Sequence, residues 1–449
     1  MARGKKKEIL TLEERLQAAL VPEGEQPYPV PGNWCWTYLG CVSDVVTGGT
    51  PSKKHPEYYG GLFPFFKPTD LDFGRHVVEA SEYLTDEGKL VSRIIPKQST
   101  AVCCIGSIGK CGFLEVEGTT NQQINSAIPK FNPLFLYYYC NTHYFNKELW
   151  SKASATTISI VNKSKMESCV FPLAPLAEQQ RIVDRIESLF AKLDEAKQKV
   201  QGALDSFETR KAAILHKAFT GELTAQWRKE HGVGMESWEN KTLQQLSQKI
   251  GDGLHGTPVY SENGAYFFIN GNNFSGLKIE IKPDTKRVDY SQYQKYKIEL
   301  GDNTVLVSIN GTLGKTALYK NELVVLGKSA CYINVGEKLN KFFLRYFLES
   351  TEFLNYADKM ATGSTIKNLG LKAMRNLMLK LPSVPEQTEI VRLLDDLIAK
   401  EQRAKEAAER VLGQIDLIKK AILARAFRGE LGTNTPNEES AVELLKQVL

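Results

Sequence analysis

The feature of this sequence that most constrains its fold is an internal duplication. Residues 178–223 and 386–431 align without a gap at an offset of 208, and 19 of the 46 aligned positions are identical. Chance does not produce such similarity, and a repeat of this kind decides the architecture before any local pattern is considered. Each copy begins with Glu-Gln and ends with Gly-Glu-Leu. We therefore expect two halves built on one frame.

The regions that precede the two copies match more loosely. Tryptophan opens each region, at Trp34 and Trp238. Three further motifs recur in the same order: Gly49-Thr50-Pro51 with Gly256-Thr257-Pro258, Gly106-Ser-Ile-Gly-Lys110 with Gly311-Thr-Leu-Gly-Lys315, and Thr157-Ile158 with Thr365-Ile366. A duplication whose halves share a frame but differ in content indicates a common scaffold that carries two different binding faces.

The two similar segments have the periodicity of long helices. Apolar or small residues recur at alternating steps of four and three, which is typical of a coiled-coil seam. Each helix is predicted to run for about 40 residues, or ~60 Å. Glu401 falls on the seam and is a polar interruption that would fix the register. The predicted seam residues are Ile186, Leu189, Leu193, Val200 and Phe207 in the first helix, and Leu394, Leu397, Val411, Ile415 and Ile422 in the second.

We favour antiparallel packing of the two helices within one chain. The duplication supplies matched partners, and such packing would relate the two halves by a pseudo-twofold axis and would form a spacer of fixed length. Two alternatives remain open from the sequence: a helical hairpin packed on its own domain, and a zipper between two copies of the chain.

The variable regions are predicted to be mixed domains of strands and turns. Short β-rich runs, separated by Gly, Asn and Asp, occur at 63–66, 100–106, 135–140, 266–270, 303–311 and 342–348. The predicted fold class is α/β (α+β), with two globular domains separated by two long antiparallel coiled-coil helices. The predicted boundaries are 1–33 for an N-terminal segment, 34–175 for the first domain, 176–235 for the first helix and linker, 236–383 for the second domain, and 384–449 for the second helix and tail.

Composition restricts the class of protein. Hydrophobic residues make up 42% and charged residues 24% of the chain, which are ordinary values for a folded protein. No apolar run reaches the ~18–20 residues of a membrane span, and the basic N-terminus lacks the apolar stretch of a signal peptide. We therefore expect a cytoplasmic protein without a membrane. The eight cysteines form no C-x-x-C pair, so reduced thiols are expected and a metal site is not.

Polar residues in the predicted turns are candidates for contacts with nucleic acid. The net charge of +5 permits such binding without requiring it. Asn and Gln can bond adenine, Arg and Lys can bond guanine, and all of them can bond phosphate. The alternative is that Asn and Gly at these positions simply form turns. The candidates are Lys67, Arg75, Ser107, Lys110, Asn121, Gln122 and Gln123 in the first domain, and Asn270, Asn272, Asn273, Asn310, Thr312 and Lys315 in the second.

Catalytic motifs are absent or incomplete. Gly314-Lys315-Thr316 resembles the end of a P-loop, but the required first glycine falls on Ile309. The chain lacks the [DN]-P-P-[YFW] tetrapeptide of adenine methyltransferases, and it lacks the serine-hydrolase and zinc-protease motifs. No catalytic residue is therefore predicted. A self-sufficient nuclease or methyltransferase is the less favoured alternative.

These motifs resemble those of the specificity (S) subunits of type I restriction-modification systems, over essentially the whole chain. The resemblance depends on the paired occurrence of P-L-A-E-Q-Q-R-I-V at 175–183 with V-P-E-Q-T-E-I-V at 384–391, and of A-F-T-G-E-L-T-A-Q-W-R at 218–228 with A-F-R-G-E-L at 426–431. The halves differ after Gly432, where the Thr-x-x-Trp-Arg ending is replaced. The helix ends are therefore not expected to bind partners identically.

The resemblance implies a function. Each variable domain would be a target-recognition domain that reads one half of a bipartite, asymmetric site in double-stranded DNA. The helices would set the gap between the half-sites and dock two modification subunits, and restriction subunits would join them. The chain itself would be non-catalytic and would hold no cofactor, since S-adenosylmethionine, ATP and Mg²⁺ would be bound by its partners. A scaffold or adaptor that binds proteins with its two domains is the alternative from another class.

Overall fold

The computed structural model describes residues 11–154, 159–363 and 365–449 of the chain. Thr157 and Ile158 of the repeated Thr-Ile motif lie outside the described residues. The chain divides into two compact units, of which unit 1 contains the residues up to Val200 together with Val411–Leu449, and unit 2 contains Gln201–Arg410. Each unit therefore combines one variable domain with the start of the long helix that follows it and the end of the other long helix.

Three small sheets form the variable domain of unit 1, hereafter domain 1. A four-stranded antiparallel sheet has the order β2-β8-β5-β6. A three-stranded sheet has the order β4-β3-β7, in which β3 and β7 are parallel, and β1 pairs with β9 where the chain enters and leaves the domain. The strands are β1 (Cys35–Tyr38), β2 (Ser43–Thr47), β3 (Tyr59–Phe66), β4 (Glu82–Leu84), β5 (Ser99–Cys103), β6 (Cys111–Leu114), β7 (Thr119–Thr120), β8 (Ile124–Pro129) and β9 (Val170–Leu173).

The variable domain of unit 2, hereafter domain 2, repeats this topology. Its four-stranded sheet has the order β11-β17-β14-β15, its three-stranded sheet has the order β13-β12-β16 with one parallel pair, and β10 pairs with β18. The duplication detected in the sequence is thus a duplication of strand order. The strands are β10 (Glu239–Thr242), β11 (Ser247–Asp252), β12 (Tyr266–Ile269), β13 (Arg287–Val288), β14 (Thr304–Ser308), β15 (Thr316–Leu318), β16 (Val324–Leu326), β17 (Ala330–Val335) and β18 (Met378–Leu381).

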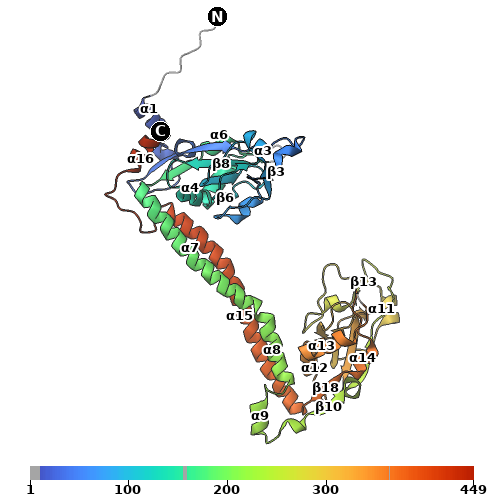
Figure 1. Cartoon of the computed structure of the whole chain (residues 1–449). Helices are drawn as coiled ribbons and strands as arrows, with labels where there is room; N and C mark the ends of the chain where they lie inside the picture. Colours follow the sequence, from blue (N-terminus) through green and yellow to red (C-terminus); the bar gives the residue numbers. More distant parts are fainter. Residues whose placement is uncertain (1–10, 155–158, 364) are drawn as a thin grey trace. The chain divides into compact units, whose positions relative to one another are not determined.

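Short helices cover these sheets, and long helices follow each domain (Figure 1). The helices that lie in unit 1 or begin there are α1 (Leu12–Ala19), α2 (Leu39–Val42), α3 (Asp86–Leu90), α4 (Pro133–Cys140), α5 (His143–Ser151), α6 (Lys163–Glu167), α7 (Leu176–Asp205) and α16 (Ala441–Val448). Those that lie in unit 2 or begin there are α8 (Phe207–Phe219), α9 (Ala225–Glu230), α10 (Leu243–Leu246), α11 (Tyr290–Tyr296), α12 (Lys341–Leu348), α13 (Thr351–Met360), α14 (Leu371–Asn376) and α15 (Val384–Ala426).

Two runs that the sequence analysis assigned to strands are helices. Residues 135–140 belong to α4, and residues 342–348 belong to α12. A continuous apolar run is equally compatible with a buried strand and a buried helix, so the residues before it decide. Asn132 and Asn340 each cap the helix that follows, because the side-chain oxygen accepts hydrogen bonds from two backbone amides of the first turn. The strand prediction is therefore wrong at both positions.

The first long helix is interrupted, whereas the second is continuous. The α7 helix ends at Asp205 and α8 begins at Phe207, while α15 runs for 43 residues. At the break, the carbonyl oxygen of Ala203 accepts hydrogen bonds from Ser206 Oγ (2.9 Å) and Arg210 Nη1 (3.1 Å). Side chains that bond carbonyl groups of the helix backbone are a recognised cause of helix bends.

The long helices pack antiparallel within each unit. In unit 1, Asp194 bonds Lys419 and Lys197 lies 3.7 Å from Asp416, so the residue number falls on α15 as it rises on α7. Figure 1 shows α7 and this part of α15 side by side. In unit 2, Arg210 Nε donates to the predicted seam residue Glu401 at 2.8 Å. Packing within one chain is thus the arrangement that the structure shows.

Each unit has a hydrophobic core that includes its pieces of both long helices. The core of unit 1 contains Ile182 and Ile186 of α7 together with Leu423 of α15. The core of unit 2 contains Leu215 of α8 together with Leu394 of α15. The domains and the helices are therefore not independent layers, because one contiguous core in each unit joins them.

The seam of α15 differs from the predicted one. Val411 is 39% exposed, and the neighbouring Leu412 is the more buried of the two. The half-buried Lys405 and Lys419 also lie on the seam, each with its ammonium group over an aromatic ring, of Phe207 at 4.7 Å and Phe190 at 5.0 Å. The aliphatic stem of a lysine can cover apolar surface while its ammonium group lies over an aromatic ring. The seam assignment of Val411 is therefore wrong.

The other predicted seam residues are buried or half-buried. Buried positions are Ile186, Phe207, Leu394 and Ile415, and half-buried positions are Leu189, Leu193, Val200, Leu397 and Ile422. All eight cysteines carry free thiols, and seven of them are buried. Among the described residues, no helix has the length and apolar character that a membrane crossing requires.

Candidate nucleic-acid interface

A buried carboxylate begins each long helix. In unit 1, Glu178 is fully buried, and its Oε2 accepts hydrogen bonds from Trp34 Nε1 (2.7 Å) and Asn434 Nδ2 (2.8 Å). Its Oε1 accepts a longer hydrogen bond from Thr433 Oγ1 (3.4 Å). A buried carboxylate needs such donors, because burying an ionised group without hydrogen-bond partners costs on the order of several kcal/mol. The opening tryptophan and the tail after α15 thus meet at the start of α7.

The corresponding site of unit 2 has the same acceptor and a different set of donors. Glu386 is 1% exposed, and its Oε2 accepts from Trp238 Nε1 at 3.0 Å. Its Oε1 accepts from Thr224 Oγ1 and Arg228 Nη1, both at 2.7 Å. Arg228 also donates to the carbonyl oxygen of Gly221 (2.6 Å), whose φ of +84° suits glycine. The Thr-x-x-x-Arg segment therefore closes this site, where unit 1 uses Thr433 and Asn434.

The glutamine of each Glu-Gln pair joins the domain to the helix. Gln179 Oε1 accepts from the backbone amide of Asn132 (3.1 Å), and Gln387 Oε1 accepts from that of Asn340 (2.8 Å). Both side-chain amides donate to the carbonyl group two residues before the helix begins, that of Ala174 or of Pro382. These contacts fix α4 and α12, the helices that these asparagines cap, against the start of the long helices.

The Ala-Phe motif at the end of each long helix completes the joint. Phe427 lies in the core of unit 1, with its ring 4.9 Å from that of Phe135 in α4. Phe219 lies in the core of unit 2, with its ring 5.3 Å from that of Phe343 in α12. The repeated motifs thus build two equivalent domain-to-helix joints. The residues of these motifs have structural roles. Contacts specific to a binding partner are therefore left to the loops of each domain.

The tail after α15 is tied to α7 by an ion pair. Arg181 donates two hydrogen bonds to Glu438, at 2.8 and 2.7 Å. This hydrogen bonding lowers the pKa of Glu438 and raises the pKa of Arg181. The residues that replace the Trp-Arg ending in the second half are therefore part of the joint of unit 1.

Equivalent loops join the third and fourth strands of the two larger sheets. The loop between β5 and β6 contains Gly106–Lys110, and the loop between β14 and β15 contains Gly311–Lys315. All four of their glycines have positive φ, which explains the repeated spacing as turn geometry. Lys110 is bound to Asp72 at 2.6 Å, whereas Lys315 is exposed. The two loops thus have the same path and a different availability of their lysine.

Several candidates of domain 1 are held by contacts inside the protein. Lys67 pairs with Glu82 at 2.9 Å. Arg75 bonds Glu115 (2.8 Å) and, on α7, Glu187 (3.2 Å). Although burial disfavours its charge, these hydrogen bonds prevail and raise the pKa of Arg75. Its guanidinium therefore acts as a clamp between domain 1 and α7.

The amides of domain 1 form a turn. Asn121 is buried and bonds both the side chain and the backbone amide of Gln123. Gln122 is exposed and accepts a hydrogen bond from Thr50, and Ser107 is exposed as well. Of these residues, Gln122 and Ser107 are accessible to a partner as the structure stands.

The amides of domain 2 divide in the same way. Asn273 is buried and bonds Glu280 and Thr285, and Asn270 caps the turn that contains Asn272. Asn310 is half-buried and bonds the side chain of Asn368. The exposed candidates of this domain are Asn272, Thr312 and Lys315.

A basic loop of domain 1 escaped the sequence analysis. Lys53 and Lys54 are exposed and follow the repeated Gly49-Thr50-Pro51 motif after Ser52. The signal was available, because the second copy of the motif is followed by Val259 and Tyr260, which are also exposed. The same turn thus presents cations in one domain and apolar or aromatic groups in the other. Among the described residues, no group of three His, Cys, Asp or Glu side chains is placed to hold a metal ion.

Comparison with known proteins identifies this duplicated frame. Residues 31–202 and 235–410 each match the family model described as the type I restriction modification DNA specificity domain, which covers more than half of the chain. The chain belongs to the family of type I restriction-modification specificity subunits. The resemblance noted in the sequence is confirmed, and the two matched regions are DNA specificity domains.

Individual relatives agree with this assignment. The specificity subunit of the type I restriction enzyme StySPI from Salmonella potsdam is 23% identical and covers 90% of both chains. That of EcoKI from Escherichia coli K12 is 22% identical and covers 93% of this chain and 95% of its own. The HsdS crystal structure from Thermoanaerobacter tengcongensis superposes with a TM-score of 0.59 at 21% identity, over 91% of this chain and all of that one. A chain from a structure of a type I restriction-modification system superposes with a TM-score of 0.65 at 20% identity, over 90% of this chain and all of that one. These structures share the fold of this specificity subunit and confirm the predicted fold class.

Proposed function

We propose that this specificity subunit binds a bipartite, asymmetric site in double-stranded DNA, one half-site per domain. The observation that supports this most directly is the pair of domains with identical strand order and different exposed loops. After the repeated turn, domain 1 has Ser52 and Lys53, followed by Lys54, where domain 2 has Val259 and Tyr260. Lysines suit phosphate and guanine, and aromatic or apolar groups suit base faces and methyl groups. Two equivalent readers with unlike loops suit two unlike half-sites.

The exposed faces of the long helices are the proposed docking sites for two modification subunits, with restriction subunits joining the complex. Leu417 and Ile418 of α15 are 64% and 45% exposed. The aligned positions of α8 hold Thr209 and Arg210, so the two docking sites are similar rather than identical. Inserting or deleting residues within 196–204 of α7 should alter the gap between the half-sites, and an unchanged gap would refute this role of the helices.

The chain contributes recognition and not chemistry in this proposal. S-adenosylmethionine, ATP and Mg²⁺ would be bound by the partner subunits, and the complex would act in the cytoplasm. The support is the absence of catalytic motifs from the sequence, together with the use of the repeated Glu, Gln and Arg residues in structural joints.

Contacts with phosphate would make binding sensitive to salt, with a log–log slope of about −0.9 for each phosphate neutralised. We expect Lys315→Ala to weaken DNA binding more than Lys110→Ala, because Lys110 is bound to Asp72 and Lys315 is exposed. If binding by both variants equals that of the wild type, these lysines are not part of the interface.

The test is to map methylated adenines in genomic DNA. The chain is co-expressed with its cognate modification subunit in a host that lacks this modification. A split motif with a fixed gap is the expected result. Methylation of one continuous sequence would show that only one domain reads DNA. A stable and active complex that methylates no specific site would contradict the proposal and favour an adaptor.

A further inference from the structure

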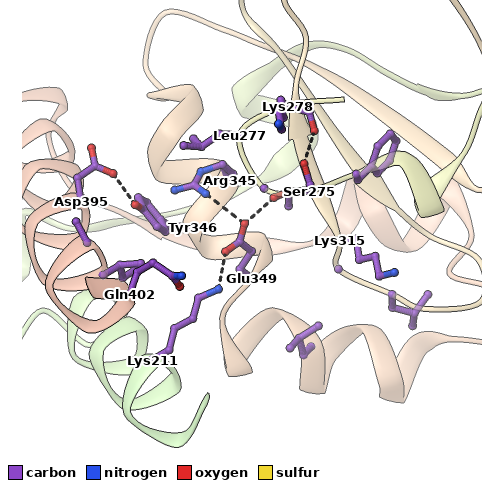
Figure 2. A pocket seen from close by; sticks show the side chains of 18 residues that line it. Lys211, Ser275, Leu277, Lys278, Lys315, Arg345, Tyr346, Glu349, Asp395 and Gln402 are labelled. Atoms are coloured by element: carbon purple, nitrogen blue, oxygen red, sulfur yellow. Dashed lines mark hydrogen bonds and ion pairs between the residues drawn. The ribbon is translucent and has the colours of Figure 1, made fainter. Parts of the chain in front are cut away.

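Unit 2 contains a cavity of about 880 Å³ where domain 2 meets its long helices. It is bounded by the segment after β12, by the loop between β14 and β15, by α12, and by α8 and α15 (Figure 2). The proposed reading loops do not require a cavity of this size, and the repeated joint contacts do not fill it.

The lining carries an excess of positive charge. Both of its carboxylates already have partners: Glu349 bonds Lys211 (3.3 Å) and Thr316 (2.7 Å), and Asp395 accepts from the hydroxyl of Tyr346 (2.5 Å). Lys278 and Lys315 are exposed and come from two different loops. The four cations of the lining are Lys211, Lys278, Lys315 and Arg345.

Arg345 is the cation of this lining that is buried and incompletely hydrogen-bonded. It is 5% exposed, and among the described residues its buried Nε has no hydrogen-bond partner. Its Nη1 makes one long hydrogen bond to Glu349, at 3.4 Å. Leaving a buried donor of a charged group unsatisfied costs free energy, and a guanidinium presents five donors in a fork that fits oxyanions. An anion in the cavity would accept from this guanidinium, which lines the cavity and makes one long hydrogen bond among the described residues.

Apolar side chains surround this charged centre. Leu277 is 51% exposed and Leu354 is 38% exposed, and both line the cavity together with the ring of Phe274. Cations alone would suit a bare anion. Exposed apolar groups beside them fit a ligand that joins an anionic group to a flat, weakly polar body.

The equivalent place in unit 1 is built differently. There Arg75 spans from domain 1 to Glu187 on α7, and Tyr138 donates to the same carboxylate at 3.2 Å. In the aligned helices, Tyr137 stands where α12 has Arg345. An internal arginine thus closes the joint of unit 1 with its own ion pair. The site with its buried, under-bonded guanidinium belongs to unit 2.

We propose that this cavity of unit 2 binds a nucleoside phosphate. The phosphate would accept hydrogen bonds from Arg345 and from the ammonium groups of Lys278 and Lys315, and the base would lie against Leu277, Leu354 and Phe274. A free nucleotide and one nucleotide of a DNA strand offer the same chemistry. Binding of a DNA nucleotide rests on the proposed function, whereas binding of a free nucleotide does not.

The test uses the full chain, in complex with its modification subunit, and three probes: dAMP, inorganic phosphate and duplex DNA. Calorimetry or saturation-transfer NMR measures binding of the two small probes, and a filter assay measures binding of DNA. Lys278→Gln combined with Lys315→Gln changes exposed side chains and should leave the fold intact. Arg345→Gln tests the buried donor. Lys320→Gln is the matched control, because Lys320 is an exposed lysine of the same domain outside the cavity lining.

Binding of dAMP that exceeds binding of phosphate, and that falls about tenfold for each cation removed, would support a nucleotide site. If dAMP does not bind but Arg345→Gln, as well as the double variant, loses DNA affinity more than the Lys320→Gln control, the ligand is a nucleotide of the strand, because Arg345 has no part in the proposed loop contacts. If dAMP does not bind and the double and Arg345→Gln variants bind DNA like the control, the proposal is overturned. Complete absence of DNA binding by the wild-type complex would instead refute the proposed function, and the dAMP result would still decide on the cavity.

Discussion

The two domain-to-helix joints differ in one respect that bears on the whole duplication. Both bury a glutamate at the start of a long helix, and in both a tryptophan indole donates to that glutamate. The remaining donors are a guanidinium and a hydroxyl in unit 2, but an amide and a hydroxyl in unit 1. Each joint therefore requires a buried glutamate with enough hydrogen-bond donors around it, whereas the chemical nature of those donors can differ. Three pairs of substitutions and one labelling assay test how far the two units differ.

The largest effect is expected from Arg228→Met. It leaves the carboxylate of Glu386 buried without its cation, which typically costs about 3–5 kcal/mol. Asn434→Ala is the matched change in unit 1 and should cost about 1–2 kcal/mol, because Glu178 keeps its hydrogen bond from Trp34. Hydrogen exchange measured on peptides of each unit reports both losses. Equal effects of the two substitutions would contradict the stronger dependence of unit 2 on its cation.

A smaller effect concerns the seam of α15. Leu412→Lys places a charge at a half-buried position and should destabilise unit 1 by about 2 kcal/mol. Val411→Lys, one residue earlier, should change stability by less than about 0.5 kcal/mol, because that side chain already faces solvent. Urea unfolding followed by circular dichroism measures both. A larger loss of stability for Val411→Lys than for Leu412→Lys would show that Val411 lies on the seam.

The next pair tests the clamp that unit 2 lacks. Tyr346→Phe removes the hydroxyl that bonds Asp395 and should cost about 1 kcal/mol. Tyr138→Phe should cost less, because Arg75 still holds Glu187 in unit 1. In the background of Arg75→Ala, the cost of Tyr138→Phe should rise towards that of Tyr346→Phe. A double-mutant cycle that shows no coupling between Arg75 and Tyr138 would argue against a clamp.

The smallest effect is in thiol reactivity. Burial raises the pKa of Cys35 and of Cys104 from the ordinary value of 9.0 to about 12. The thiols therefore stay neutral at pH 8, and their contribution to stability is present below pH 9 and is lost as the pH rises towards 12. Labelling with iodoacetamide should modify the half-buried Cys41 first.

The single cysteine of unit 2 makes the same assay specific for that unit. Cys331 is buried there, and the other seven cysteines lie in unit 1. In the Arg228→Met variant, the labelling rate of Cys331 should rise above that of the wild type, while the labelling rate of Cys35 stays unchanged. Simultaneous acceleration would show that the two units do not open separately.

The sequence predicted the duplicated architecture better than it predicted the side-chain contacts. Duplication, helix periodicity and two mixed domains follow from spacing alone, and the structure confirms the fold class. The joints could not be predicted, because the partners of Glu178 and Glu386 lie far away in the chain. A lysine such as Lys419 reads as a surface residue unless the aromatic ring beneath it is known. In the loops, a buried Asn273 that bonds its own turn and an exposed Asn272 have the same sequence signature.

The central claim is that one frame carries two independent DNA readers. The most direct measurement is adenine-methylation mapping after a domain exchange, in which residues 239–381 are replaced by the corresponding domain of the EcoKI specificity subunit and the exchanged chain is co-expressed with its modification subunit. If the two domains read DNA independently, one half of the methylated motif changes, while the other half stays as in the wild type. A motif in which both halves change, or in which neither does, would contradict it.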